Sequence, residues 1–254
     1  GLFFIIAAIP TFLWVRERTI ARAMPPGENF FSIGVKRLKK TFIDIRDYRD
    51  LAVLLASFFF AYAGLSIVIA FAFIYGDQVI RWAGSTQILM FVLTQITAAG
   101  GALLFGLLQD SWGAKRTFIL TLLLWVAAVS LIYGVSPVTE WLSGLAGTPL
   151  KEEHVFLMIG AIAGLGLGST QSACRAMVGL FSPDTKAGEF FGLWSLTSRL
   201  SAIAGLMGLG VLQAWLGLHR AILVCSAFFF IAVVIVLFVD EERGKRTARA
   251  HAGE

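Results

Sequence analysis

Six long apolar runs, separated by shorter polar segments, dominate the hydrophobic pattern of this 254-residue chain. They lie at about residues 51–75, 86–108, 117–135, 155–179, 190–215 and 221–239. An α-helix needs about 20 apolar residues to cross a bilayer core about 30 Å thick. Only helices and closed barrels satisfy their backbone polar groups in lipid, and barrel strands alternate over about ten residues. The pattern therefore predicts an all-α membrane protein with six spanning helices.

Shorter segments flank these runs. Residues 1–15 are apolar but short for a span, and we expect them to be the end of a preceding transmembrane helix in a longer protein. Residues 16–50 are predicted to form a cytoplasmic linker, in which Val35–Asp47 has the pattern of an amphipathic surface helix. The predicted six-helix bundle occupies residues 51–239, and residues 240–254 form a cytoplasmic tail.

Composition and charge support this class. The chain is 57% hydrophobic and 15% charged, with a mean hydropathy of +0.80, which excludes an ordinary soluble domain. The net charge of +5 reflects Lys and Arg at helix ends, so it indicates topology and not nucleic-acid binding. The positive-inside rule places the linker, the Lys115 and Lys186 loops and the tail in the cytoplasm. We expect an integral protein of the bacterial inner (plasma) membrane.

Arg199 is the most unusual polar residue, because it is the one charge in the run from Phe190 to Leu216. It lies about 15 Å along the helix from Glu189, near the middle of the bilayer. A cation at that depth costs several kcal/mol unless it faces protein or water, so it indicates a functional site. The alternative is an arginine that pairs with a neighbouring helix and only fixes packing.

Other polar side chains are expected at a similar depth. Tyr62 and Gln95 lie near the middle of the first and second runs, and Ser195 shares a helical face with Arg199. A cation, an amide and a phenol together suit a ligand that carries a carboxylate. Hydrogen bonds between helices, without any ligand, are the alternative for Tyr62 and Gln95.

The fourth run combines a small-residue stripe with two polar residues. Gly160, Gly164 and Gly168 recur every fourth residue, which predicts close helix packing. Gln171 and Arg175 continue the same face. Gln171 is a candidate solute contact. Arg175 lies near the cytoplasmic rim, where we favour a gate or interface pair over a solute contact.

The spans offer no mid-membrane nucleophile, metal-ligand set or acid–base pair, which argues against an enzyme and predicts no metal and no cofactor. Cys174 and Cys225 fall inside apolar runs and are interpreted as packing residues. Glu189 opens the fifth run, where a helix dipole favours an anion, so a structural cap is expected.

A glycine-rich turn joins the second and third runs. Gly106 is expected to permit tight helix contact, and Gly113 to permit the reversal of the chain. Asp110 can accept hydrogen bonds from helix N-terminal amides or from the neighbouring Lys115 and Arg116. A generic topological turn would explain the two cations but not the Gly–Asp–Gly spacing.

This turn resembles the G-x-x-x-D-x-x-G-x-K/R-R/K signature of the major facilitator superfamily, although Ser111 stands where many members have arginine. The stretches Gly164–Arg175 and Glu189–Ser195 resemble the G-x-x-Q-x-x-x-R and E-F-F-G helices of the branch related to the vacuolar effluxers of autophagy. The resemblance covers essentially the whole chain.

The resemblance implies the six-helix C-terminal half of a twelve-helix carrier, whose partners are an N-terminal six-helix half, the lipid bilayer and a small solute. It implies transport by alternating access, with amino-acid efflux as the activity of eukaryotic relatives. The solute is expected to be small, polar and carboxylate-bearing. A non-transporting membrane scaffold or receptor-like protein is the alternative.

Overall fold

The computed structural model describes residues 2–14, 29 and 48–250. Helix α1 (Leu2–Trp14) belongs to a unit of its own, residues 1–37, and the remaining helices belong to a second unit, residues 38–254. The helical character expected for residues 1–15 is thus confirmed for α1. The predicted surface helix at Val35–Asp47 lies outside the described residues.

All six predicted spans are long α-helices in the second unit, which confirms the fold class. They are α3 (Arg49–Tyr75), α4 (Gly84–Trp112), α5 (Ala114–Tyr133), α7 (Glu152–Phe181), α8 (Ala187–Leu216) and α9 (Leu218–Leu237). The helices begin slightly before the apolar runs because polar residues form their first turns. Asp50, Glu152 and Glu189 are examples, and an acid is favourable beside the N-terminal amides.

Four shorter elements were not expected from the hydrophobic pattern. They are η1 (Gly76–Ile80), α6 (Val135–Ala146), η2 (Asp184–Lys186) and α10 (Glu241–Ala250). Helix α10 occupies the segment predicted as a tail. Its sequence is dominated by charged residues, but Gly244 and Ala248 are buried, so one narrow face packs against the bundle.

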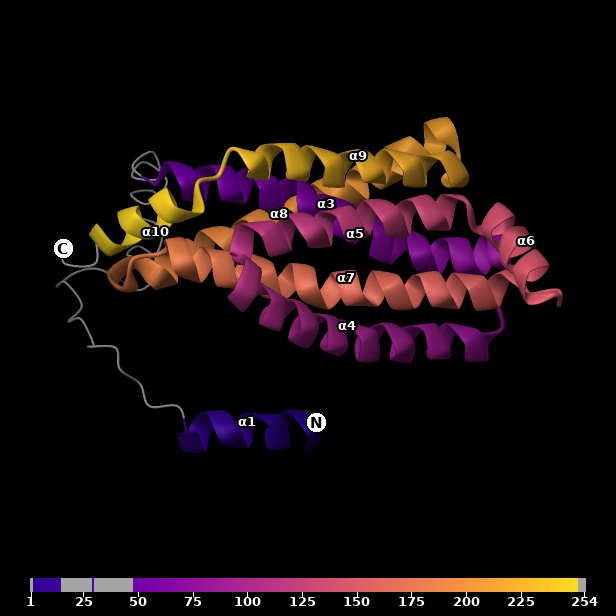
Figure 1. The fold of residues 1–254 in the computed structure, drawn as a ribbon, viewed down its shortest axis with the longest axis horizontal. Helices are drawn as coiled ribbons and strands as arrows, with labels where there is room; N and C mark the ends of the chain where they lie inside the picture. The colour runs from indigo at the N-terminus through magenta and orange to yellow at the C-terminus, as the bar shows by residue number, and fades with distance from the viewer. Residues whose placement is uncertain (1, 15–28, 30–47, 251–254) are drawn as a thin grey trace. The chain divides into compact units, whose positions relative to one another are not determined.

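The bundle consists of two groups of helices that meet along its length (Figure 1). Helix α3 packs against α8 and α9, while α7 packs against α4 and α5, and contacts between α5 and α9 join the groups. Helix α10 lies at one end of the bundle and α6 at the other. We call the end with α10, the start of α3 and the α4–α5 turn the basic end, because it holds Arg49, Lys115, Arg116 and Arg243.

Packing and buried hydrogen bonds hold the helices together, since lipid itself supplies little hydrophobic drive for their association. The ring of Trp125 stacks on Phe229 at 5.4 Å, and its Nε1 donates to Thr170 Oγ1 at 3.0 Å. Ser57 Oγ donates to the Ala232 carbonyl at 2.8 Å. These contacts tie α3, α5, α7 and α9 into one core.

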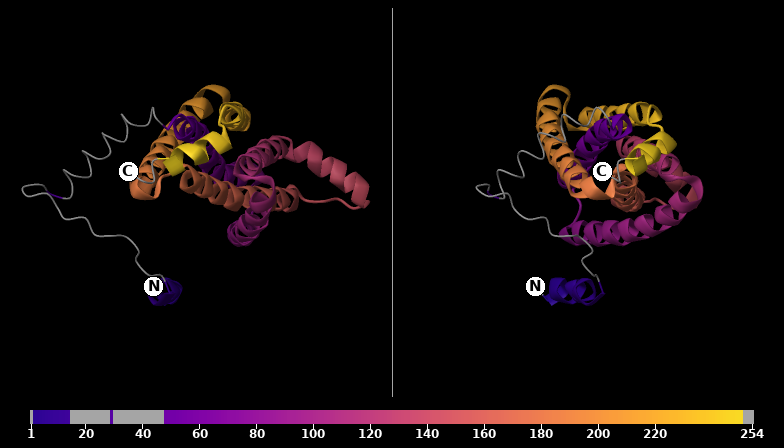
Figure 2. Two further views of the ribbon diagram at one scale, coloured as in Figure 1. Left: turned by 60° about the vertical axis from the view of Figure 1, so that its left-hand side comes forward. Right: turned by 90° about the vertical axis from the view of Figure 1, so that its left-hand side faces the viewer.

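The six long helices differ in exposure, and α4 and α8 are the most exposed of them in this unit. The reason is that α5 and α9 pack on each other as well as on α7 and α3, whereas α4 and α8 each lean on one main neighbour. Figure 2 (right) shows α4 and α8 at the rim of the bundle.

Candidate functional site

Helices α4 and α7 approach each other so closely that several contact positions have room only for glycine. A Cβ atom on Gly168 would collide with the carbonyl oxygen of Ala98, and one on Gly164 would collide with Thr97 Oγ1. Thr97 Oγ1 itself donates to the Leu93 carbonyl at 2.9 Å, so its polar atom is satisfied within α4. The packing role predicted for the Gly160–Gly164–Gly168 stripe is thus confirmed.

An open groove with a volume of about 570 Å³ lies beside this contact. We call it the polar groove. Its lining includes Gln95, Ala98 and Ala102 from α4 and Gln171, Ser172 and Arg175 from α7. The structure therefore brings together Gln95 and Gln171, two of the residues selected from the sequence, and adds Arg175 to them.

A second cavity, of about 200 Å³, lies between α3, α4 and α7. Its walls are almost entirely apolar and include Val68, Phe73 and Phe91. Gln95 and Leu167 line both this apolar cavity and the polar groove. The polar groove, with its amide and guanidinium groups, and the apolar cavity, with its aromatic and aliphatic groups, are thus neighbours that share Gln95 and Leu167.

Arg175 is the cation of the polar groove. Its guanidinium carbon lies 5.7 Å from the centre of the Trp194 ring, a cation–π contact to α8. Tyr62 meets the same Trp194 ring edge-on at 6.4 Å. Within the part of the chain that the structure describes, Arg175 has no carboxylate partner. Its side chain is exposed, so its charge is open to an anionic ligand.

Arg199 and Ser195 do not join this group. Both are exposed on α8, and neither lines the polar groove or the apolar cavity. Among the described residues, Arg199 therefore shares neither the polar groove nor the apolar cavity with Gln95. Depth along a helix does not fix which face points inward, and α8 turns its buried side to α3 and α9. Among the described residues Arg199 has no ion-pair partner either.

The α4–α5 turn is a sharp reversal at Gly113, whose φ of 88° is in the left-handed region that favours glycine. At the start of α5, the backbone N–H of Lys115 donates to Glu241 Oε2 of α10 at 3.0 Å. The Nζ of Lys115 donates to the carbonyls of Leu237 and Val239, at 2.9 and 2.6 Å. Lys115 thus satisfies carbonyls at the end of α9, as a cation does at a helix C-terminus.

Two expectations about this turn are corrected. The acid that accepts from the α5 N-terminus is Glu241, while Asp110 is exposed and has no hydrogen-bond or ion-pair partner among the described residues, as is also true of Arg116. A Cβ atom on Gly106 would meet nothing within 4 Å, so no contact with the described residues requires glycine there. The glycine near the middle of α4 that does lie against α7 is Gly101, where a Cβ atom would collide with the Leu165 carbonyl oxygen.

Helix α10 is held to the bundle by ion pairs that span the chain. The buried carboxylate of Asp50 accepts from Arg243 Nε at 2.6 Å and from Arg243 Nη2 at 2.8 Å. Glu241 Oε1 pairs with Lys245 Nζ at 2.7 Å. Burial raises the pKa of the Glu241 carboxyl, but the hydrogen bonds from Lys245 and the Lys115 N–H outweigh it and hold that pKa below its usual range.

The remaining sequence candidates are placed as expected. Glu189 lies in the first turn of α8 and is half-buried. Cys174 and Cys225 are free thiols within the core, and Cys225 Sγ lies 3.2 Å from the Gly64 carbonyl that accepts its hydrogen bond. The ion pairs of α10 could not be found from the sequence, because Asp50 and Arg243 are 193 residues apart.

Comparison with known proteins adds to these observations. A family model described as "Vacuole effluxer Atg22 like" matches residues 1–249. The chain belongs to that family. No solved structure matches it.

Curated relatives carry the same family name. The chain is 25% identical over 269 residues to autophagy-related protein 22-1 of Aspergillus fumigatus, covering 100% of this chain and 43% of that protein. It is 23% identical over 268 residues to autophagy-related protein 22 of Yarrowia lipolytica, covering 98% of this chain and 44% of that protein. The chain thus spans less than half the length of these relatives. They do not come from bacteria, so the bacterial location stays a prediction.

Proposed function

We propose that this chain provides six helices of a secondary transporter that moves a small, carboxylate-bearing solute such as an amino acid across a membrane. The family description supports transport, because it names an effluxer. The polar groove supports the solute class. Its guanidinium, on Arg175, has no carboxylate partner among the described residues and lies beside the amides of Gln95 and Gln171. That exposed, uncompensated cation is the observation that carries the proposal.

The chemistry of the groove suits an amino acid. A guanidinium binds a carboxylate with two parallel hydrogen bonds, and it stays charged at any physiological pH. Amide oxygens of Gln95 and Gln171 can accept from an ammonium group, and their NH₂ groups can donate to the carboxylate. The adjoining apolar cavity offers room for an apolar side chain. Because Gln95 lines both cavities, it is proposed to lie near the α-carbon of such a solute.

Arg199 is proposed as a second cation along the solute path. It lies in the middle of α8, about 18 Å from the start of that helix, and is exposed on the surface of this unit. A cation at that depth needs water or a protein partner. A water-filled path between this bundle and a second six-helix half would provide the water.

Alternating access is proposed to be rocking of two six-helix halves around this path. The long exposed faces of α4 and α8 would then be the surfaces that the other half covers in turn. The basic end is proposed to face the cytoplasm of a bacterial cell, since its Lys and Arg residues follow the positive-inside rule.

The test is solute transport by the full-length protein in proteoliposomes, across a panel of radiolabelled amino acids. Arg175→Gln is expected to reduce transport of an accepted solute about tenfold or more, because a hydrogen bond to a charged group contributes about 1.5–3 kcal/mol. Arg116→Gln is the matched control, since Arg116 is exposed at the basic end and outside the groove. Arg199→Gln tests the second cation and is expected to have an intermediate effect.

Two results would reject the proposal. One is unchanged transport by Arg175→Gln, and the other is an equal loss in Arg175→Gln and Arg116→Gln. A scaffold function predicts no solute-dependent change in access to the groove. Ala98→Cys, in the groove wall, can be labelled with a membrane-impermeant maleimide with and without solute. Both native thiols are buried, so they contribute little background.

A further inference from the structure

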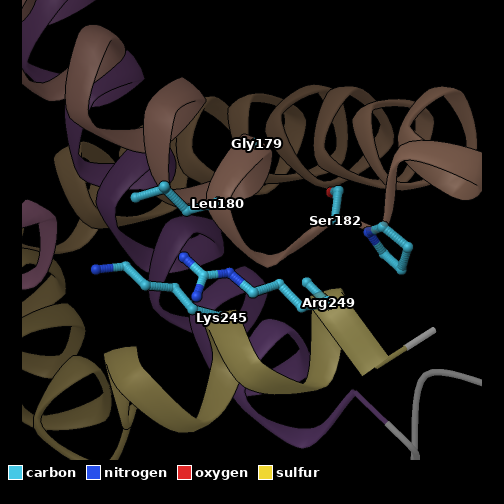
Figure 3. A pocket seen from close by; sticks show the side chains of 7 residues that line it. Gly179, Leu180, Ser182, Lys245 and Arg249 are labelled. Atoms are coloured by element: carbon cyan, nitrogen blue, oxygen red, sulfur yellow. The ribbon is translucent and has the colours of Figure 1, made fainter. Parts of the chain in front are cut away.

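A separate pocket lies at the basic end, between the end of α7 and α10 (Figure 3). It has a volume of about 370 Å³. Its walls include Gly179, Ser182 and Pro183 on one side and Lys245, Ala248 and Arg249 on the other. We call it the basic pocket, because its charged lining residues are both cations. It shares no residue with the polar groove.

The backbone of α10 is fixed so that the pocket exists before any ligand binds. A Cβ atom on Gly244 would lie 2.9 Å from Phe181 Cε1, so the absence of a side chain lets α10 rest directly on the end of α7. Ala248, one helical turn further on, is also buried. The Asp50–Arg243 pair holds the start of α10 against α3. A preformed pocket avoids the ordering cost of assembling one on binding.

The pocket contains one cation that no described acid pairs with. Lys245 Nζ is shared between Glu241, at 2.7 Å, and Glu242, at 3.3 Å. Arg249 has no carboxylate within ion-pair distance among residues 48–250. In Figure 3 the Arg249 side chain extends along the pocket toward Lys245. The Ser182 hydroxyl donates to the Val178 carbonyl at 2.6 Å, and Lys245 is engaged by two carboxylates, so the charged donor open to a ligand is the Arg249 guanidinium.

We propose that the basic pocket binds a phosphate group. A guanidinium can bind phosphate oxygens through two parallel hydrogen bonds, and Arg249 supplies a charge that no described acid of α10 offsets. Helix α9 ends at Leu237 and α10 begins at Glu241, so the pocket lies at the depth where a spanning helix leaves the bilayer. Basic residues next to a spanning helix are typical of contact with anionic lipid headgroups. The proposal does not depend on the transported solute.

The experiment measures binding of short-chain phosphatidic acid to the purified full-length protein in neutral detergent, by native mass spectrometry and by the rise in melting temperature. Arg249→Gln is expected to weaken this binding about fivefold, the effect of roughly 1 kcal/mol for one cation at a membrane surface. Arg246→Gln is the matched control: Arg246 is on the same helix and exposed, but it does not line the pocket. It is expected to change binding less than about twofold.

Competition with inorganic phosphate identifies the source of the phosphate group. Displacement of the lipid by millimolar inorganic phosphate would assign the pocket to soluble phosphate compounds, and failure to displace it would assign the pocket to lipid headgroups. Equal losses in Arg249→Gln and Arg246→Gln would overturn the proposal, because they would show a diffuse surface charge. So would equal affinity of phosphatidic acid and phosphatidylcholine. Unchanged melting temperatures of both variants without lipid establish that the fold is intact.

Discussion

The polar groove and the basic end use charged side chains in opposite ways, although they belong to the same bundle. At the basic end, Asp50 is paired with Arg243 and Glu241 with Lys245, so these charges are committed to the fold. In the polar groove, Arg175 rests on an aromatic ring and has no acid among the described residues. The helices there are held by backbone contact between small residues. Paired charges indicate structure, and an unpaired cation in a groove indicates a ligand.

The contact between α4 and α7 depends on close approach of their backbones. Disrupting this contact is expected to have the largest effect on stability. A Cβ atom on Gly101 would lie 2.8 Å from Leu165 Cα, whereas one on the neighbouring Gly100 would meet nothing within 4 Å. Gly101→Ala is therefore expected to destabilise the protein by about 1–3 kcal/mol through overpacking. Thermal unfolding of the purified protein measures this.

Gly100→Ala is the control, because both substitutions change helix propensity in the same helix and by the same amount. Its melting temperature is expected to equal or slightly exceed that of the wild type. Similar losses of thermal stability in the two variants would show that close backbone contact does not determine the α4–α7 interface.

A smaller effect is expected at the basic end for Glu241→Gln. The variant loses the ion pair to Lys245 and weakens the bond to the Lys115 N–H. The expected cost is about 1 kcal/mol, since the pair is partly open to solvent and screened. Raising the salt concentration is expected to reduce the difference from the wild type.

The pH dependence of this difference follows from the lowered pKa of Glu241. A carboxyl with a lower pKa in the folded state contributes its full stability above its unfolded pKa, about 4.3, and loses it as the pH falls through the folded value. Melting temperatures of wild type and Glu241→Gln should therefore differ at pH 7 and converge below about pH 4. A difference that persists in acid would assign the effect to packing.

Asp110→Asn is expected to have the smallest effect, within about 0.5 kcal/mol. Asp110 is exposed and without a partner among the described residues, while Glu241 occupies the place beside the α5 N-terminus. Chemical unfolding of this variant and of Glu241→Gln separates the two acids. A larger loss of stability for Asp110→Asn than for Glu241→Gln would show that Asp110, and not Glu241, is the acid that stabilises the α4–α5 turn.

Local pattern was sufficient to predict the fold but only part of the site. Apolar runs of about twenty residues have one solution in lipid, so all six spans could be located. Glycine spacing likewise predicted the α7 side of the α4–α7 contact. Helical periodicity gives each polar residue a depth and a face, but not the direction in which that face points. For this reason the depths of Gln95, Gln171 and Arg199 could be predicted, but not that Gln95 and Gln171 line one groove while Arg199 does not.

The contacts of α10 show the second limit. Its sequence, Glu-Glu-Arg-Gly-Lys-Arg, is that of an ordinary polar tail, and nothing local marks Arg243 as the partner of Asp50. Glycine is unfavourable inside a helix, so the helix itself does not explain Gly244. Its close contact with Phe181 does. Pairs this distant in sequence become visible only when the bundle is assembled.

The Asp50–Arg243 pair also sets an order for assembly of the bundle. Asp50 stands at the first turn of α3, and Arg243 is synthesised 193 residues later. At a synthesis rate of about 5–20 residues per second, the carboxylate waits roughly 10–40 s for its guanidinium. The nascent helices can enter the bilayer one after another, but the ion pair between α3 and α10 can form only after α10 has been synthesised.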